Sequence, residues 1–254
     1  MAAAAPVLVL DVLDSTNAEA RRRAEAGETG PLWIAARRQT AGRGRRGREW
    51  ASDSGNLFTT LLMHTDRPAA EAAQVTFVAA LAVADLLDAY APPSLVTIKW
   101  PNDVMLAGKK ASGVLVESGP AERGGLWLAV GVGVNLAHAP TDVERPATSL
   151  AEHLRGDVAA TPDVAVAAET LAKAFAVWME RWDTLGFTPV LDAWRRRTQL
   201  DGPCVARLGH ETVEGVAEGV EADGALRLRL ADGRLRIIAA GDVFFAPHAD
   251  LGAA

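Results

Sequence analysis

Residues 126–136 read Leu-Trp-Leu-Ala-Val-Gly-Val-Gly-Val-Asn-Leu, an alternation that predicts a β-strand with two unlike faces. One face carries only leucine and valine and must be buried in a core. The other face carries Gly131, Gly133 and Asn135. Glycine weakens a strand, so its recurrence on one face indicates that something lies close against the backbone there. A packed helix and a flat ligand both satisfy this pattern, and the polar Asn135 favours a ligand.

A second feature is the arginine loop, residues 42–48, with the sequence Gly-Arg-Gly-Arg-Arg-Gly-Arg. Its glycines allow the backbone to approach a ligand closely, and its arginines offer forked donors suited to carboxylate and phosphate oxygens. Such a run is also typical of a solvated face or a loose nucleic-acid contact. The 254-residue chain has a formal net charge of -6, however, so it lacks the broadly basic surface of a general nucleic-acid binder. We therefore expect the loop to serve one local anionic ligand.

Two common phosphate-binding motifs do not fit the sequence. Gly42, Gly44 and Gly47 satisfy the dinucleotide pattern G-x-G-x-x-G after the apolar segment Leu32 to Ala36, but turn-forming residues follow where a helix should begin. A Walker A loop ending at residue 109 would need a glycine at position 103, where Asp103 stands. The residues around each motif therefore exclude both a dinucleotide-binding loop and a Walker A loop.

Composition narrows the class of protein further. A hydrophobic content of 49% is ordinary for a soluble globular chain, and the apolar run Val75 to Leu87 is too short to span a bilayer, which favours a buried helix. Cys204 is the single cysteine, so no internal disulfide can form, and the five scattered histidines show no metal-ligand spacing. The N-terminus lacks the charged start and long apolar region of a secretion signal. We predict a cytoplasmic protein with no membrane partner.

The elements expected from periodicity and turn signals alternate between strand and helix in the first 200 residues. A strand at Leu8 to Leu13 leads into a helix to Ala26, with Thr16 and Glu19 as a capping box and Gly27 closing it. The other expected elements are strands at 56–63 and 96–100, a long apolar helix at 69–90, a helix with Leu171, Phe175, Trp178, Trp182 and Leu185 on one face, and a helix at 190–197.

From Asp201 onward the pattern changes to short alternating segments separated by turn residues. These segments are residues 204–208, 212–218, 225–230, 234–238 and 243–245. They predict a small all-β barrel, and therefore two domains, residues 1–200 and residues 201–254.

Five motifs in this order resemble those of the biotin protein ligases. They are Asp14-Ser15-Thr16-Asn17, Gln39-Thr40-Ala41 followed by the arginine loop, Lys99-Trp100-Pro101-Asn102-Asp103, Lys110-Ala111-Ser112-Gly113 and Gly131-Val132-Gly133-Val134-Asn135. The resemblance extends from about Leu8 to Phe245. It implies an α+β fold, in which a mixed β-sheet flanked by helices forms a class II synthetase-like catalytic domain, followed by a small C-terminal SH3-like β-barrel.

The resemblance also implies the reaction: biotin is activated by ATP to biotinyl-5′-AMP and pyrophosphate, and then transferred to a lysine of a biotin carboxyl carrier domain. Biotin's carboxylate and the ATP phosphates repel by about 1 kcal/mol at about 4 Å in water, and by about 4 kcal/mol at an effective dielectric constant near 20. Cations must offset that repulsion. The adenylation lysine of the family matches Lys110, while its neighbour Lys109 is expected to be solvated.

The remaining roles implied by the resemblance fall into three groups. The catalytic residues are Lys110 and Arg43. The biotin-binding residues are Ser15, Thr16, Asn17, Gln39, Gly42, Arg43, Gly44, Arg45, Lys110, Gly113, Gly131 and Gly133. The adenylate-binding residues are Arg45, Arg46, Trp50, Asn102, Lys110 and Asn135, with Arg48 structural. Asp103 is a possible ligand of Mg²⁺, although a turn after Trp-Pro also explains it.

Two other functions compete with this prediction. Lipoyl ligases share the catalytic fold, and a non-enzymatic module could bind nucleic acid through the arginine loop alone. Family members that repress transcription carry an N-terminal DNA-binding domain, whereas this chain starts almost at the first catalytic strand. We therefore expect no operator binding.

Overall fold

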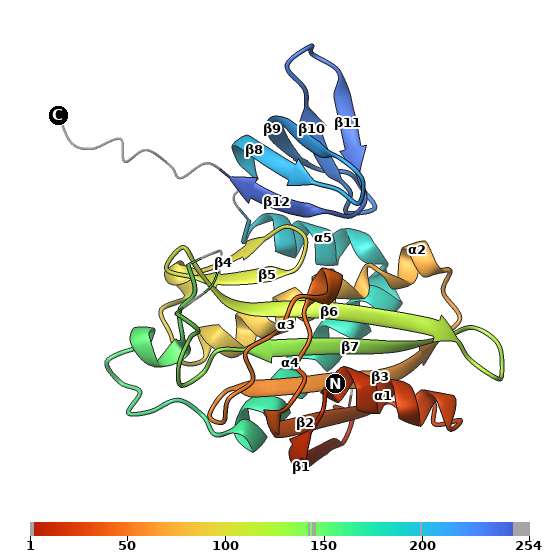
Figure 1. Cartoon of the computed structure of the whole chain (residues 1–254), viewed down its shortest axis with the longest axis vertical. Helices are drawn as coiled ribbons and strands as arrows, with labels where there is room; N and C mark the ends of the chain where they lie inside the picture. Colours follow the sequence, from red (N-terminus) through yellow and green to blue (C-terminus); the bar gives the residue numbers. More distant parts are fainter. Residues whose placement is uncertain (1–2, 142, 144–145, 199, 246–254) are drawn as a thin grey trace.

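The computed structural model describes residues 3–141, 143, 146–198 and 200–245. A seven-stranded central sheet has the strand order β1-β2-β3-β7-β6-β5-β4 (Figure 1). Its strands are β1 (Val7–Leu13), β2 (Leu32–Gln39), β3 (Leu57–Thr65), β4 (Val96–Lys99), β5 (Asp103–Leu106), β6 (Lys109–Pro120) and β7 (Leu126–Val134). Strands β1 and β2 are parallel and the other pairs are antiparallel, so the sheet is mixed, as predicted.

Helices cover both faces of the central sheet, with α1 on one side and α3 and α4 on the other (Figure 1). The helices are α1 (Thr16–Glu25), α2 (Ala69–Ala72), α3 (Val75–Asp88), α4 (Val164–Leu185) and α5 (Phe187–Arg195), with short 3₁₀ turns η1 (Arg45–Gly47), η2 (Pro93–Leu95) and η3 (Leu150–His153). The predicted alternation in β7 is confirmed, because Leu128, Val130 and Val132 join the core under α3 and α4, while Ala129 packs under α1.

The start of α1 differs from the prediction. Ser15 is the N-cap residue and makes no side-chain capping bond. The Thr16 hydroxyl instead contacts Gln39, and the Glu19 carboxylate accepts from the arginines of the next turn. The predicted capping box is therefore wrong: tertiary and ion-pair partners replace the local backbone donors. Gly27 does close the helix, with φ +88° and its amide bonded to the Ala24 carbonyl.

The long apolar helix predicted over 69–90 is broken into α2 and α3. The helical segment Ala69–Asp88 is longer than the apolar run Val75 to Leu87 considered in the sequence, and by length and composition alone it could cross a membrane. In the structure 67% of its most apolar window is buried inside the protein. Its main part, α3, packs on the sheet against β4, β6 and β7, beside α4, which contacts β1, β2 and β3 directly. In α4 the predicted apolar face is buried except for Leu185 in the last turn, which is 67% exposed, so that residue was wrongly placed in the core.

Strands β5 and β6 are absent from the prediction. They form a hairpin whose two turn residues, Ala107 and Gly108, have φ of +50° and +75°. Two central residues with positive φ match the twist of a tight hairpin. Alanine is not a residue usually associated with such a turn, so Ala107 offers little sign of the hairpin in the sequence. This hairpin carries Asp103 and Lys110, so it contributes directly to the site described below.

A second, five-stranded antiparallel sheet, called here the C-terminal sheet, has the order β11-β10-β9-β8-β12. Its strands are β8 (Asp201–Arg207), β9 (Thr212–Val220), β10 (Leu226–Arg229), β11 (Leu235–Ile238) and β12 (Asp242–Phe245). All five predicted segments are thus strands. One continuous apolar core joins the two sheets, and the buried Trp100 Nε1 donates to the Gly224 carbonyl at 2.9 Å.

Candidate functional site

A cavity of about 610 Å³ lies over the α1 side of the central sheet, and residues of the arginine loop and of β12 contribute to its wall. Most residues predicted for the site line it. Those lining residues are Ser15, Thr16, Asn17, Gln39, Arg43, Gly44, Arg45, Trp50, Asn102, Asp103, Lys110, Gly113, Gly131, Gly133 and Asn135. Gly42 and Arg46 do not line it. Gly42, at the start of the loop, packs against residues 50–52, where a Cβ would lie 2.1 Å from Ser52 Oγ. Arg46 donates to the Arg207 carbonyl of the C-terminal sheet at 2.9 Å.

The glycines of β6 and β7 form a flat floor because larger residues would collide with what covers them. A Cβ on Gly131 would lie 2.0 Å from Asn17 Oδ1, and a Cβ on Gly133 would lie 2.5 Å from the Trp50 indole. Gly113 is paired with Gly133 across the strands and also faces Trp50. The helix explanation therefore applies to Gly131, which Asn17 of α1 covers, while Trp50 and the cavity lie over Gly113 and Gly133. The ligand explanation stays a prediction.

A buried polar network lines the end of the cavity at the start of α1. The Thr16 amide donates to Gln39 Oε1 at 2.8 Å, and the Thr60 hydroxyl donates to Asn17 Oδ1 at 2.7 Å. Asn17 Nδ2 in turn donates to Glu117 at 2.8 Å. These bonds fix Asn17 and Gln39 in one orientation, so the polar end of the cavity is formed by side chains that are held from several strands.

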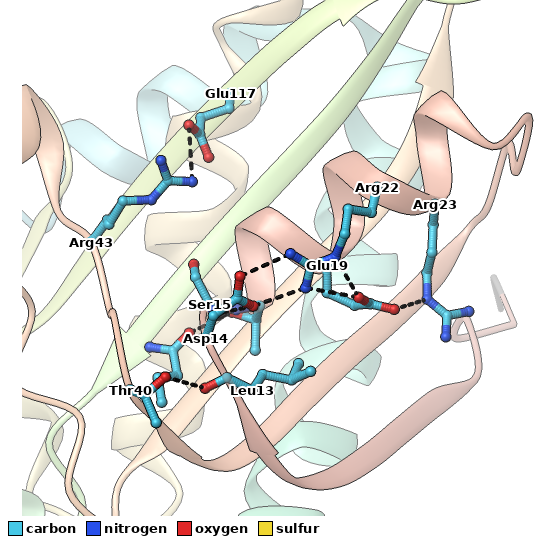
Figure 2. A network of polar contacts seen from close by, with 11 residues as sticks. Leu13, Asp14, Ser15, Glu19, Arg22, Arg23, Thr40, Arg43 and Glu117 are labelled. Atoms are coloured by element: carbon cyan, nitrogen blue, oxygen red, sulfur yellow. Dashed lines mark hydrogen bonds and ion pairs between the residues drawn. The ribbon is translucent and has the colours of Figure 1, made fainter.

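Figure 2 shows how this end is connected to the arginine loop. Arg43 reaches across from the loop to the Glu117 carboxylate, with a nitrogen to oxygen distance of 3.8 Å. On the outer side Arg22 donates to both oxygens of Asp14, each at 2.8 Å. That contact lowers the pKa of the Asp14 carboxyl to about 2. The motif Asp14-Ser15-Thr16-Asn17 thus places Asp14 on the surface and the next three residues at the cavity.

The arginine loop is held by the C-terminal sheet. The Arg48 guanidinium lies 2.8 Å from Asp242, and those of Arg45 and Arg46 lie 3.6 and 3.8 Å from it. Arg45 also donates to Asn102 Oδ1 at 3.0 Å, and burial lowers its pKa while Asp242 opposes the shift. Asp242 was missed by the sequence analysis, because only the tertiary fold brings β12 to residues almost 200 positions earlier.

The lysine and the carboxylate from the β5–β6 hairpin form an ion pair inside the cavity. Lys110 Nζ lies 2.6 Å from Asp103 Oδ1 and 5.3 Å from the centre of a Trp50 ring. Lys109, one residue earlier, is exposed. Within the described residues no group of three or more His, Cys, Asp or Glu side chains is arranged to hold a metal ion. Asp103, predicted from the sequence as a ligand of Mg²⁺, lies in the cavity and is paired with Lys110.

Asn135 lies at the far end of the floor. Its amide nitrogen Nδ2 donates to the Thr148 carbonyl at 3.1 Å, and the side chain is buried. This bond fastens the segment after β7 to the sheet. The Lys110 amide and carbonyl bond to Pro146 and Thr148 of the same segment, so Asn135 and Lys110 are braced by one stretch of chain.

Fold and cavity together define an α+β chain whose mixed sheet carries a cavity lined by arginine and lysine side chains. Residues 9–135 match the Biotin/lipoate A/B protein ligase family, and residues 200–246 match the Biotin protein ligase C terminal domain. The biotin–acetyl-CoA-carboxylase ligase of Paracoccus denitrificans is 44% identical over 91% of this chain and 97% of its own length. The bifunctional ligase/repressor BirA of Bacillus subtilis is 31% identical over 91% of this chain and 71% of its own length.

Among solved structures, the biotin protein ligase from Aquifex aeolicus in complex with biotin and ATP has a TM-score of 0.76 at 24% identity, covering 95% of this chain and 99% of that chain. This likeness supports the fold, including a small SH3-like C-terminal unit. The chain belongs to the biotin/lipoate A/B protein ligase family.

Proposed function

We propose that this protein is a ligase that activates biotin with ATP to biotinyl-5′-AMP and transfers biotin to a lysine of a biotin carboxyl carrier domain. One observation carries the proposal: Lys110, Arg43 and Arg45 line a single cavity that has a glycine floor. The Paracoccus denitrificans relative, at 44% identity over almost its whole length, is named for biotin and acetyl-CoA carboxylase. The residues that line the cavity and the similarity to this relative support the same reaction.

The first step joins two anions. A carboxylate oxygen of biotin attacks the α-phosphorus of ATP, the bond from that phosphorus to the bridging oxygen breaks, and pyrophosphate leaves. Lys110 is the proposed catalytic cation, because a point charge with rotatable donors can follow the negative charge from carboxylate to acyl phosphate. Arg43, from the loop, is the second proposed cation. In the structure Lys110 is paired with Asp103, so it must exchange that partner, at least in part, for the substrates.

Biotin is proposed to bind at the α1 end of the floor. Ser15, Thr16, Asn17 and Gln39 offer hydroxyl and amide groups to its polar ring, since the network around them is already oriented. The backbone of Gly113, Gly131 and Gly133 allows the ring and chain to lie flat on the sheet once the Trp50 indole, which covers Gly113 and Gly133 in the structure, moves aside. Gly42, Gly44 and Arg45 complete the proposed biotin set from the loop side.

The adenylate is proposed to lie toward the hairpin and the C-terminal sheet. Its proposed contacts are Arg45, Arg46, Trp50, Asn102, Lys110 and Asn135. Arg46 faces Arg207 and Asp242 in the structure, so its role requires the Arg46 side chain to turn toward the cavity when nucleotide binds.

A Mg²⁺ ion is proposed to accompany ATP. Proteins commonly hold Mg²⁺ through one or two carboxylates, with phosphate oxygens and waters completing the shell. Asp103, which lines the cavity and is paired with Lys110, would supply one such carboxylate. When bound, the ion would supply further neutralising charge to the phosphates. The steps assigned above to Lys110 and the arginines do not depend on it.

The second step needs no nucleophile from this protein. The amine of the acceptor lysine attacks the mixed anhydride, the bond from the acyl carbon to the phosphate oxygen breaks, and AMP leaves. The duty of the site before that is to keep water from the activated carbonyl. Closure of the arginine loop over the cavity would serve that purpose.

We also propose a division into a catalytic unit, residues 1–200, and an SH3-like unit, residues 201–254, and a cytoplasmic location, because the reaction consumes ATP. The acceptor is proposed to be the carrier domain of a biotin-dependent carboxylase. The family also includes lipoate ligases, so the acid must be tested directly.

The test is the exchange of labelled pyrophosphate into ATP, measured with purified protein and a panel of acids. Biotin should support exchange, while lipoate and octanoate at equal concentration should not. Exchange with lipoate alone would overturn the assignment of biotin. Exchange with none of the acids would overturn the activation step itself.

A further inference from the structure

Asp242 is a buried carboxylate at the first position of β12, and no motif of the sequence analysis includes it. Its residue is 7% exposed, although it comes from the C-terminal sheet rather than from the sheet that forms the cavity floor. Three guanidinium groups of the arginine loop surround it. The shortest contact is the hydrogen bond from Arg48 Nη2 to Asp242 Oδ2, at 2.8 Å.

The backbone next to Asp242 takes part in the same arrangement. Arg45 Nη2 donates to the Gly241 carbonyl at 3.0 Å, and Arg46 Nη2 donates to the Arg207 carbonyl at 2.9 Å. Arg207 is paired with Asp242 in the β8–β12 ladder. Acceptors at one end of the C-terminal sheet therefore hold three successive arginines of a loop that lies almost 200 residues earlier in the chain.

Charge explains why such an anchor is needed. Three guanidinium groups gathered at one point repel each other, and a flexible loop that contains three glycines would relieve that repulsion by spreading. One carboxylate compensates only one of the three charges. Asp242 thus reduces the repulsion within the cluster but leaves it with an excess of positive charge. That charge lies beside the cavity, which Arg45, Arg48 and Asp242 all line.

We infer that Asp242 is a positioning residue that gathers the arginine loop into a cationic wall ready for the phosphates of ATP. The inference rests on the proposed function, since it assigns the wall to the ATP side of that site. Asp242 acts through the arginines and itself touches no substrate. The opposite role, in which Asp242 competes with phosphate for the arginines, predicts the opposite change in ATP affinity.

The geometry favours gathering over competition. Arg48 alone makes a short hydrogen bond to Asp242, while Arg45 and Arg46 lie beyond 3.5 Å from its oxygens. A guanidinium has five N–H donors, so donors remain for a phosphate without loss of the contact to Asp242. The arginines can therefore bind Asp242 and a phosphate at the same time.

The experiment compares the wild type with Asp242→Asn, Asp242→Glu and the control Glu214→Gln, which removes an exposed carboxylate from β9 of the same sheet. Steady-state pyrophosphate release, with a biotin carboxyl carrier domain present to accept biotin from the adenylate, gives KM for ATP and for biotin separately. For Asp242→Asn we expect KM for ATP to rise about tenfold or more, with KM for biotin changed less than about twofold. Asp242→Glu should recover most of the ATP affinity, and Glu214→Gln should match the wild type. An unchanged or lowered KM for ATP in Asp242→Asn would overturn the inference.

Loop order is a second readout, because trypsin cleaves after arginine. In the absence of ligand, Asp242→Asn should be cut within residues 43–48 faster than the wild type at a temperature where both remain folded. Equal cleavage rates would contradict the gathering role.

A variant on the loop side guards against misfolding of the C-terminal sheet. Arg48→Gln removes the shortest contact and leaves β12 intact, so it should also raise KM for ATP. If Asp242 acts through Arg48, the double variant should be little worse than the poorer single variant. Fully additive losses would overturn the coupling. Biotin-dependent pyrophosphate release by the wild type distinguishes these failures from a failure of the proposed function.

Discussion

Lys110 and Lys109 are adjacent in the sequence but have different surroundings. Lys110 lies in the cavity against Asp103 and Trp50, whereas Lys109 is exposed. Replacement of Lys110 by alanine should lower the rate of biotinyl-adenylate formation by about 10²- to 10³-fold, because it removes a cation placed where charge develops. Single-turnover formation of the adenylate, followed by quenching and chromatography, measures this rate.

Lys109→Ala is the matched control and should keep the wild-type rate. Lys109→Ala should keep the wild-type free energy of unfolding to within about 0.5 kcal/mol, since that side chain is exposed. Lys110→Ala should remain folded but lose more stability, because it removes the ion pair to the buried Asp103 carboxylate. A Lys110→Ala protein that forms adenylate at the wild-type rate would contradict the role given to this residue.

Helix α1 begins at a point where an ion pair stabilises the chain outside the cavity. The folded pKa of Asp14 is about 2 against 3.8 for the free group, so the contact with Arg22 stabilises the fold fully above about pH 4. That stabilisation is lost as pH falls through 2. Asp14→Asn should therefore lower the free energy of unfolding at pH 6 by less than about 1 kcal/mol, because the Asp14 side chain is 47% exposed.

Urea unfolding from pH 6 to pH 2.5 checks this expectation, with Asp11→Asn as a control from the same N-terminal segment. The difference between Asp14→Asn and the wild type should narrow below pH 4. A difference that stays constant, or grows, toward low pH would show that the carboxylate of Asp14 does not provide the stabilisation.

At the scale of elements, the sequence predicted the strands and helices that have a clear period. The alternation in β7 and the short strands of the C-terminal sheet are examples, since each is set by local pattern and turn residues. The β5–β6 hairpin was missed because its turn uses Ala107 in a positive-φ conformation that alanine rarely adopts. The predicted capping box is wrong because the Thr16 hydroxyl bonds to Gln39, a tertiary partner that the local sequence does not reveal.

The candidate site shows the same division. Residues within contiguous motifs, such as Gln39 and Lys110, could be predicted and do line one cavity. Asp242 and Glu117 could not, because each acts on the arginine loop from a strand distant in sequence. Local periodicity contains no information on which distant carboxylate will meet a given arginine.

Across the whole molecule, the two sheets share one core, so they should unfold together. The Phe77 ring of α3 packs edge-on against Phe187 and Trp194, with ring centres 5.3 and 5.0 Å apart. It also packs against the turn between β9 and β10 of the C-terminal sheet, because a Cβ on Gly224 would be 2.6 Å from Phe77 Cζ. Phe77→Ala should cost about 3–5 kcal/mol of stability and lower the unfolding midpoint of both sheets equally.

Cys204 reports on the C-terminal sheet in this experiment. The thiol is buried and its pKa is raised by that burial, so a thiol reagent should label it slowly until the sheet opens. Cys204 labelling and tryptophan fluorescence should change at the same urea concentration in the wild type and in Phe77→Ala, while the surface change Val177→Ala should leave both unchanged. Separate midpoints for the two probes would contradict a shared core.

The central claim is that the cationic cavity brings a carboxylate of biotin onto the α-phosphorus of ATP. Biotin labelled with ¹⁸O in its carboxylate tests this claim most directly, with ATP, Mg²⁺ and a carrier domain present and the released AMP analysed by mass spectrometry. Attack by the carboxylate leaves one of its oxygens on the phosphate, so the AMP should carry one ¹⁸O for each biotin transferred. Biotin transferred with unlabelled AMP, or with ADP and labelled inorganic phosphate, would contradict the account.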